Sequence, residues 1–110
     1  MEKSKKLHYG IYNDFYSGML TNRQSEVIRM YYDEDLSLNE IAERLSISPQ
    51  GVMDALKHGE KSLDSFEEKL GLVKKSNLCI ELLEELKAVV DKVDSKYVEK
   101  INSVISVLEN

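Results

Sequence analysis

Cysteine and proline are nearly absent from this chain of 110 residues, because each occurs only once. A single cysteine, Cys79, excludes an internal disulfide, so the fold must depend on its hydrophobic core. The residues around Cys79 are mostly apolar. They predict an ordinary buried thiol in a protein of a reducing compartment.

Long hydrophobic runs are missing as well. The first six residues are mostly charged, and tyrosines and polar residues follow them in place of the apolar segment of a secretory signal. No later stretch provides the roughly 20 consecutive apolar residues that a membrane-spanning helix needs. These absences predict a cytoplasmic protein without membrane insertion.

The residue patterns of common catalytic and metal sites are also absent. The nearest metal-binding candidates, His8, His58 and Cys79, lie far apart and lack the spacing of metal ligands. There is no glycine-rich phosphate loop and no nucleophile elbow. The acidic pairs at 67–68 and 84–85 are expected on the solvent side of helices. The chain is therefore predicted not to be an enzyme and to need no metal or cofactor.

Positive charge is scarce for a nucleic-acid-binding protein. The net charge is −5, with −2 up to Ser62 and −3 beyond it, so neither half is basic. Lys3, Lys5 and Lys6 could contact phosphates, or they form a solvated terminus. The acidic loop at 33–35 is expected to be solvated, and it would repel a phosphate backbone close to it.

The composition favours an all-α fold. Strong helix formers prevail, and β-branched residues rarely cluster. From Lys5 to Tyr16 an amphipathic helix is expected to bury an apolar face with a four-residue spacing, formed by Leu7, Ile11 and Phe15. The neighbouring face carries three tyrosines that could stack on bases or cover the edge of the core, namely Tyr9, Tyr12 and Tyr16.

A second helix is expected after Gly18. Thr21 and Gln24 have the spacing of a capping box, in which each side chain pairs with the other residue's backbone N–H. The apolar residues expected to face the core are Val27, Ile28, Met30 and Tyr31.

The stretch from Leu36 to Leu63 has the pattern of a helix-turn-helix. Ser37 and Glu40 form a second capping box before a short helix. After the turn at 46–48, Ser48 is the expected N-cap of the next helix and Pro49 its first residue. The inward side of that helix should carry Val52, Ala55 and Leu56. The same pattern also fits an ordinary helical corner inside a bundle.

The outward side of this second helix is the candidate nucleic-acid-binding surface. The residues expected to contact nucleic acid are Arg44, Ser48, Gln50, Met53, Lys57, His58 and Lys61. Gln50 is the best candidate to read a base, while Arg44 and the N-terminal lysines would contact phosphates. Met53 is expected to be largely exposed. Between Pro49 and Lys61 the charges of Lys57 and Lys61 are balanced by two acids, Asp54 and Glu60.

The helix of the motif is expected to continue and to end at Gly59 or Gly71, with Gly71 favoured. About six helices are expected, in a helix-turn-helix domain over residues 1–70 and a C-terminal helical region over 71–110. In that region Ser76 is expected to cap a helix with a wide apolar stripe, formed by Cys79, Leu82, Leu83, Leu86, Val89, Val90 and Val93.

A last helix, capped by Asp94 or Ser95, should complete the C-terminal region. Its apolar side is expected to carry Val98, Ile101, Val104, Ile105 and Leu108. So wide an apolar surface on a short chain also indicates a homodimer.

This part of the chain resembles the promoter-reading C-terminal domain of bacterial sigma factors, through residues 20–24, 27–28, 31, 36–37, 40–42, 48–52, 56 and 63. Over its whole length the chain is similar to the YlxM-like family of helix-turn-helix proteins, through residues 14–16, 20–24, 31–32, 37–43, 60–61 and 67–70. The resemblance implies a sigma-factor-like helix bundle. It also implies a gene beside those of the signal recognition particle, with a regulatory or accessory part in that pathway.

The sequence departs from the family at two positions of the motif. The family tends to carry a basic residue after the N-cap serine and another at the end of the motif, where this chain has Pro49 and His58. Asp54 adds a like charge near any phosphate. Two interpretations follow: a nucleic-acid-binding regulator, or an adaptor of the signal recognition particle GTPases that no longer binds DNA.

Overall fold

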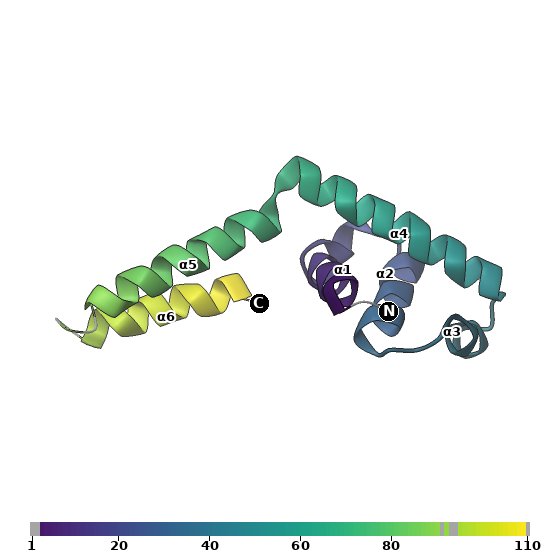
Figure 1. Cartoon of the computed structure of the whole chain (residues 1–110), viewed down its shortest axis with the longest axis horizontal. Helices are drawn as coiled ribbons and strands as arrows, with labels where there is room; N and C mark the ends of the chain where they lie inside the picture. The colour runs from purple at the N-terminus through teal and green to yellow at the C-terminus, as the bar shows by residue number, and fades with distance from the viewer. Residues whose placement is uncertain (1–2, 91, 93–94, 110) are drawn as a thin grey trace. The chain divides into compact units, whose positions relative to one another are not determined.

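The computed structural model describes residues 3–90, 92 and 95–109 of the chain (Figure 1). Six α-helices lie in these ranges, and no strand does, which confirms the all-α prediction. They are α1 (Lys3–Tyr16), α2 (Asn22–Ile28), α3 (Leu38–Leu45), α4 (Pro49–Leu70), α5 (Leu72–Val90) and α6 (Ser95–Glu109). A 3-10 turn, η1 (Ser17–Met19), precedes α2, and a π-helical turn, η2 (Arg29–Asp33), follows it.

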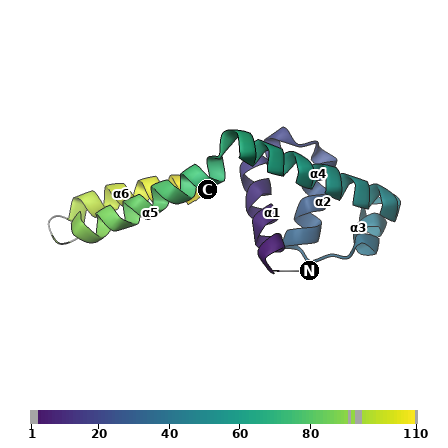
Figure 2. The ribbon, with the colours of Figure 1, turned by 45° about the horizontal axis from the view of Figure 1, so that its top comes forward.

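The chain forms two compact units, Met1–Gly71 and Leu72–Asn110. In the first unit α1, α2 and α3 all lie along one side of the long helix α4 (Figures 1 and 2). Its buried hydrophobic side chains are Tyr16, Val27, Ile28, Met30, Tyr32, Ile41, Ala42, Val52, Leu56 and Leu63. This core holds α3 and α4, the two helices of the motif, together in one packed unit.

Side-chain caps start α2 and α3 at the predicted residues. Thr21 accepts a hydrogen bond from the backbone N–H of Gln24, and the Gln24 side chain accepts one from the backbone of Thr21. Ser37 and Glu40 form the same reciprocal pair. Each box satisfies two backbone donors that the first turn of a helix leaves free. Both predicted capping boxes are thereby confirmed.

Helix α1 is rotated relative to the prediction. Leu7 is 65% exposed and Phe15 38% exposed, whereas the fully buried side chain of this helix is Tyr16. Gly10 and Asn13 face the core with Tyr16. The Asn13 amide is satisfied there, because it donates to the Ser25 carbonyl at 3.2 Å. The apolar stripe predicted for the core is therefore largely at the surface.

The turn after α2 also differs from the prediction. Residues 29–33 form a π-helical turn, which is wider than an α-helical one. Tyr32 is only 1% exposed. Tyr31, which was expected in the core, is half-buried. The wider turn thus brings the ring of Tyr32 to α4.

Helix α4 continues past Gly59 and ends before Gly71, as the sequence favoured. Gly71 has φ 62° and ends the helix in the left-handed conformation that glycine adopts most easily. Gly59 is buried in the helix interior, where α2 approaches closely. A Cβ at Gly59 would lie 2.6 Å from Cδ1 of Ile28, so any larger residue there must displace the Ile28 side chain.

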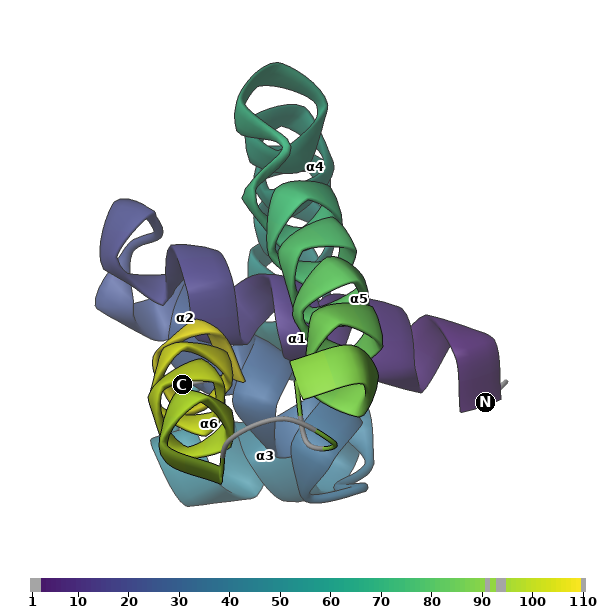
Figure 3. The same cartoon turned by 90° about the vertical axis from the view of Figure 1, so that its left-hand side faces the viewer.

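In the second unit α5 and α6 lie side by side and antiparallel (Figures 2 and 3). Ser76, expected as a cap, lies in the second turn of α5, because that helix starts at Leu72. Its hydroxyl is buried and donates to the Leu108 carbonyl at 3.1 Å. Ile101 and Ile105 of α6 are buried as predicted.

The apolar stripe expected on α5 is mostly exposed within the chain. Leu86, its centre, is 50% exposed, and Leu82 is 55% exposed. Cys79 is exposed as well, so the prediction of a buried thiol, which rested on its apolar neighbours, is wrong. Val93 of the stripe and the proposed cap Asp94 lie outside the described residues. Within the described ranges, no helix has the length and apolar content needed to span a membrane.

Candidate nucleic-acid interface

The motif consists of α3, a tight turn and the first half of α4. Ser46 adopts the left-handed conformation, with φ 55°, and its backbone N–H closes the end of α3. Ser48 then caps α4 by accepting a hydrogen bond from the Gly51 N–H at 3.0 Å, and Pro49 is the first helical residue. Pro49 costs no hydrogen bond there, because its position would leave an N–H unpaired in any case. The predicted helix-turn-helix is therefore present.

Most of the predicted contact residues lie at the surface. The exposed ones are Arg44, Ser48, Gln50, Lys57, His58 and Lys61. Met53 is an exception, because its side chain is half-buried rather than largely exposed. Lys57 and Lys61 extend from consecutive turns of α4 and bring positive charge to this surface. Of the N-terminal lysines, Lys6 is paired with Asp35 at 2.6 Å.

Two of the predicted contact residues already have partners within the chain. The Gln50 side-chain amide donates to the Asp54 carboxylate at 3.0 Å. Arg44 lies 3.6 Å from the Glu34 carboxylate, which also pairs with Arg29. Glu34 belongs to the acidic loop that was expected to be merely solvated. No local pattern predicts this pairing, because Arg44 is ten residues away along the chain.

Glu60 faces the core side of α4 and not its outward surface. It accepts a hydrogen bond from the Tyr32 hydroxyl at 2.5 Å in a partly buried position. In the charge balance drawn from the sequence, the negative charge of Glu60 offset the positive charge of one outward lysine. With Glu60 directed inward, Asp54 is the acid between Pro49 and Lys61 that remains beside Lys57 on this surface. The outward surface of α4 is thus more positive than the sequence indicated.

Tyrosines also engage two further carboxylates of α4. Tyr9 donates to Asp64 at 2.8 Å, and Tyr16 donates to Glu67 at 2.5 Å. Burial and the hydrogen bond to Asp64 raise the pKa of Tyr9 above its usual range. Burial, together with the hydrogen bond to Glu60, does the same to the pKa of Tyr32. These tyrosines hold α1 and η2 against α4, and Tyr16, which is 1% exposed, is inaccessible to bases.

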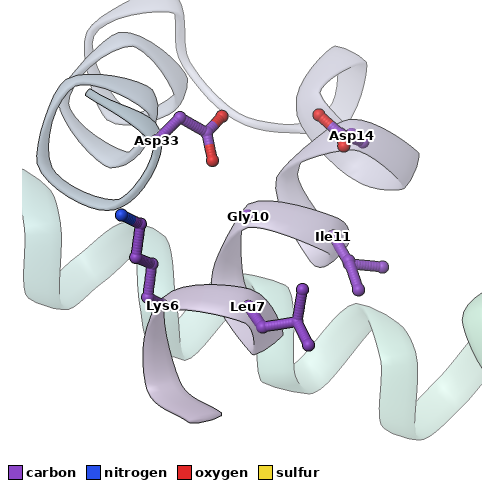
Figure 4. Close-up of a pocket in the computed structure, with 6 residues that line it drawn as sticks. All are labelled: Lys6, Leu7, Gly10, Ile11, Asp14 and Asp33. Carbon is purple, nitrogen blue, oxygen red and sulfur yellow. The ribbon is translucent and has the colours of Figure 1, made fainter. Parts of the chain in front are cut away.

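A pocket on the first unit lies apart from this surface. Its lining residues are Lys6, Leu7, Gly10, Ile11, Asp14 and Asp33 (Figure 4). They come from α1 and η2, and Lys6 is the one among them that was predicted to contact phosphate. Burial, with the nearby charge of Asp33, raises the pKa of Asp14. Within the described ranges, no group of three or more His, Cys, Asp or Glu side chains could hold a metal ion.

The cap of α3 makes a pH-dependent contribution to the stability of the motif. The backbone N–H of Ser37 and then its side chain hold the pKa of Glu40 below its ordinary value of 4.5. This contribution is complete above about pH 4.5 and is lost as the pH falls through the lower pKa of the folded state. Glu40→Gln should keep the box, as Gln24 does in α2, but remove this pH dependence. Urea unfolding of both proteins at neutral pH and at about pH 3 tests it, and an unchanged difference between them contradicts it.

Comparison with known proteins gives consistent matches. A family model described as "Putative helix-turn-helix protein, YlxM / p13 like" matches residues 1–104. A UPF0122 protein of Caldanaerobacter subterraneus is 54% identical over 74 residues, which cover 67% of this chain and 63% of that protein. The chain thus spans just under two thirds of that relative.

Two other relatives match almost from end to end. A UPF0122 protein of Exiguobacterium sp. is 39% identical over 110 residues, which cover 100% of this chain and 96% of that protein. The UPF0122 protein YlxM of Bacillus subtilis is 38% identical over 109 residues, which cover 99% of this chain and 96% of that protein. Together with the capped α3–α4 motif, these matches show that the chain belongs to the YlxM / p13-like family of helix-turn-helix proteins.

Proposed function

We propose that this protein is a nucleic-acid-binding regulatory or accessory protein that contacts DNA or RNA through α3 and the outward surface of α4. The observation that carries the proposal is the exposed row of Lys57, His58 and Lys61 on a helix held by a capped turn. Glu60 supports it, because its carboxylate is directed to Tyr32 and away from that row. Helices in this arrangement place their outward residues in a groove.

The proposed binding is modest and depends on salt. Phosphate contacts by lysine and arginine supply most of the affinity of such proteins, and this surface offers few of them. Gln50 must exchange its hydrogen bond with Asp54 for one with a base before it can read sequence. We therefore expect recognition of backbone shape and charge to outweigh recognition of bases.

The proposed biological setting is the signal recognition particle pathway. This part of the proposal rests on the resemblance to the YlxM-like family, which implies a gene beside those of the particle. Structured RNA is therefore tested along with duplex DNA. Fluorescence anisotropy at low salt, with a random duplex and with a structured RNA, provides the test. Absence of salt-sensitive binding to both would refute the proposal.

Substitutions on α4 should change this binding in opposite directions. Lys57→Ala and Lys61→Ala should each weaken binding and lower the salt slope by about one, because each removes a phosphate contact. Asp54→Asn should strengthen binding by roughly two- to five-fold at low salt, because it removes a like charge. Glu99→Gln, at an exposed site on α6, is the matched control and should leave binding unchanged. Equal effects of Asp54→Asn and Glu99→Gln would show that only the net charge matters.

A second candidate function is that of a protein-interaction adaptor of the signal recognition particle GTPases. Two contacts within the chain favour it. Glu34 forms an ion pair with Arg44, and Asp54 accepts a hydrogen bond from Gln50, so both predicted contact residues are already engaged. The acidic net charge of −5 points the same way. Co-purification with the particle's GTPase or its receptor, after nuclease treatment, separates the two candidates. An association that nuclease abolishes supports nucleic-acid binding and excludes the adaptor.

A further inference from the structure

Helix α1 carries an apolar row on its outer side, formed by Leu7, Ile11 and Phe15. These residues recur every four positions and therefore share one face of the helix. Leu7 is 65% exposed and Phe15 38% exposed, while Ile11 is half-buried. The opposite side of α1 already fills its place in the core with Asn13 and Tyr16. The outer row is thus available for contact with another molecule, and it is called the α1 row below.

The α1 row borders the pocket that α1 forms with η2. This pocket has a volume of about 470 Å³, and Leu7 and Ile11 supply its apolar lining (Figure 4). Gly10 lets η2 approach α1 at this point, because a Cβ on it would lie 2.7 Å from Oδ1 of Asp33. The volume is in the range in which proteins bind ligands. The apolar surface of α1 therefore continues into a recess that can receive a side chain of another molecule.

Two carboxylates, those of Asp14 and Asp33, also line the pocket, and Figure 4 shows them on either side of Gly10. Asp14 is one turn beyond Gly10 on α1, about 6 Å along the helix axis. Burial and the charge of Asp33 raise the pKa of Asp14, so the two carboxylates repel each other. Among the described side chains, neither carboxylate has an ion-pair or hydrogen-bond partner. A cation bound between them would remove this repulsion.

Lys6 does not supply that cation, although it lines the same pocket. Its Nζ lies 2.6 Å from the carboxylate of Asp35, which is outside the lining. This ion pair leaves the charges of Asp14 and Asp33 uncompensated, so the pocket is negative. A negative pocket repels the phosphates of a nucleic acid. The chemistry that complements this part of the chain is instead an apolar surface next to a positive charge.

We propose that the α1 row and its pocket bind a basic amphipathic helix of a partner protein. Apolar residues one turn apart on that helix pack against Leu7, Ile11 and Phe15. An arginine beside them enters the pocket and pairs with Asp14 and Asp33, because its planar fork of N–H donors can reach two carboxylates. The α1 row is about 12 Å long, which matches two turns of a partner helix. The described ranges contain no strand to which an extended peptide could add.

Selection from a library of helical peptides tests this proposal without a known partner. The library is an alanine-based helix of about 15 residues, randomised along one face, and the full chain is the target. Peptides that also bind the Leu7→Ser variant are removed, because they bind elsewhere on the chain. The remaining peptides should carry apolar residues one turn apart, next to an arginine or a lysine. A selection that leaves no peptides, or only neutral or acidic ones, would overturn the proposal.

Fluorescence anisotropy with the tightest selected peptide then tests the two carboxylates. Asp14→Asn/Asp33→Asn should weaken binding at least about ten-fold. Glu81→Gln/Glu99→Gln makes the same change in net charge at exposed positions of α5 and α6, and it should leave binding unchanged. Replacing the peptide's arginine by glutamine should weaken binding to the wild type but hardly affect binding to Asp14→Asn/Asp33→Asn, because that contact is already lost. Equal losses for the two double variants, or additive effects, would contradict the proposal.

A second copy of the chain is the alternative occupant of the α1 row, and Leu7→Asp tests it. Leu7 is largely exposed, so this variant should keep its helices, which circular dichroism checks. Sedimentation velocity over a concentration series should give the variant the same oligomeric state as the wild type. A different state would show that the α1 row contacts another copy of the chain, and it would overturn the proposal.

Discussion

Leu63→Ala is expected to lower the free energy of unfolding of the first unit by about 2–5 kcal/mol. Leu63 lies in the middle of α4 and is 0% exposed, on the side that α1 and α2 cover. Removing most of its side chain leaves a cavity that the surrounding helices can fill only partly. The loss therefore combines the transfer free energy of the removed atoms with the cost of the cavity.

Urea denaturation at one fixed protein concentration measures this loss, since any self-association would make the midpoint depend on concentration. Leu70→Ala is the matched control, because Leu70 lies on the same helix and is 40% exposed. We expect it to cost less than about 1 kcal/mol. Equal losses for the two variants would mean that α4 does not bury the side assigned to it.

The helix boundaries in the first unit could be predicted because their signals are local. A capping box needs only two residues three positions apart, and Ser37 with Glu40 satisfies it without any tertiary contact. The end of α4 is local in the same way, because it needs only a glycine at position 71, which takes the left-handed conformation. The exposed positions of Lys57 and Lys61 follow from the helical period once Val52 and Leu56 are placed in the core.

The buried side of α1 could not be predicted, because two rows of similar spacing compete on one helix. Phe15 is more apolar than Tyr16, so the period favours the wrong row. The tyrosine is buried because Glu67 on α4 supplies an acceptor for its hydroxyl at 2.5 Å. A buried tyrosine hydroxyl requires such a partner. That partner is 51 residues away, so no local pattern reveals it.

A partner far away in the sequence also explains why the charge of the candidate site was predicted wrongly. Glu60 was counted as an outward acid because its neighbours on α4 face outward. Its position is decided by Tyr32, which the π-helical turn of residues 29–33 brings to α4. A turn of this kind has no clear local signal. The charge that a nucleic acid would meet therefore depends on a feature visible only in the fold.

Gly59→Leu is expected to destabilise the first unit by about 3 kcal/mol or more. Gly59 lies inside α4, where glycine is normally unfavourable by about 1 kcal/mol relative to alanine. Glycine is favoured here because a Cβ would lie 2.6 Å from Cδ1 of Ile28 and 3.4 Å from Cβ of Gln24. Ile28 is 0% exposed, so its side chain can move only against other buried groups of the core.

A double-mutant cycle tests whether this single contact is responsible. Gly59→Ala alone should fail to gain the stability that alanine usually gives a helix, because of the clash with Cδ1 of Ile28. Ile28→Val removes that carbon atom, so in its background Gly59→Ala should be less harmful, with a coupling of about 0.5–3 kcal/mol. Gly18→Ala is the control, because nothing lies within 4 Å of a Cβ at that position. Additive effects of the Gly59 and Ile28 substitutions would show that α2 and α4 do not meet at this glycine.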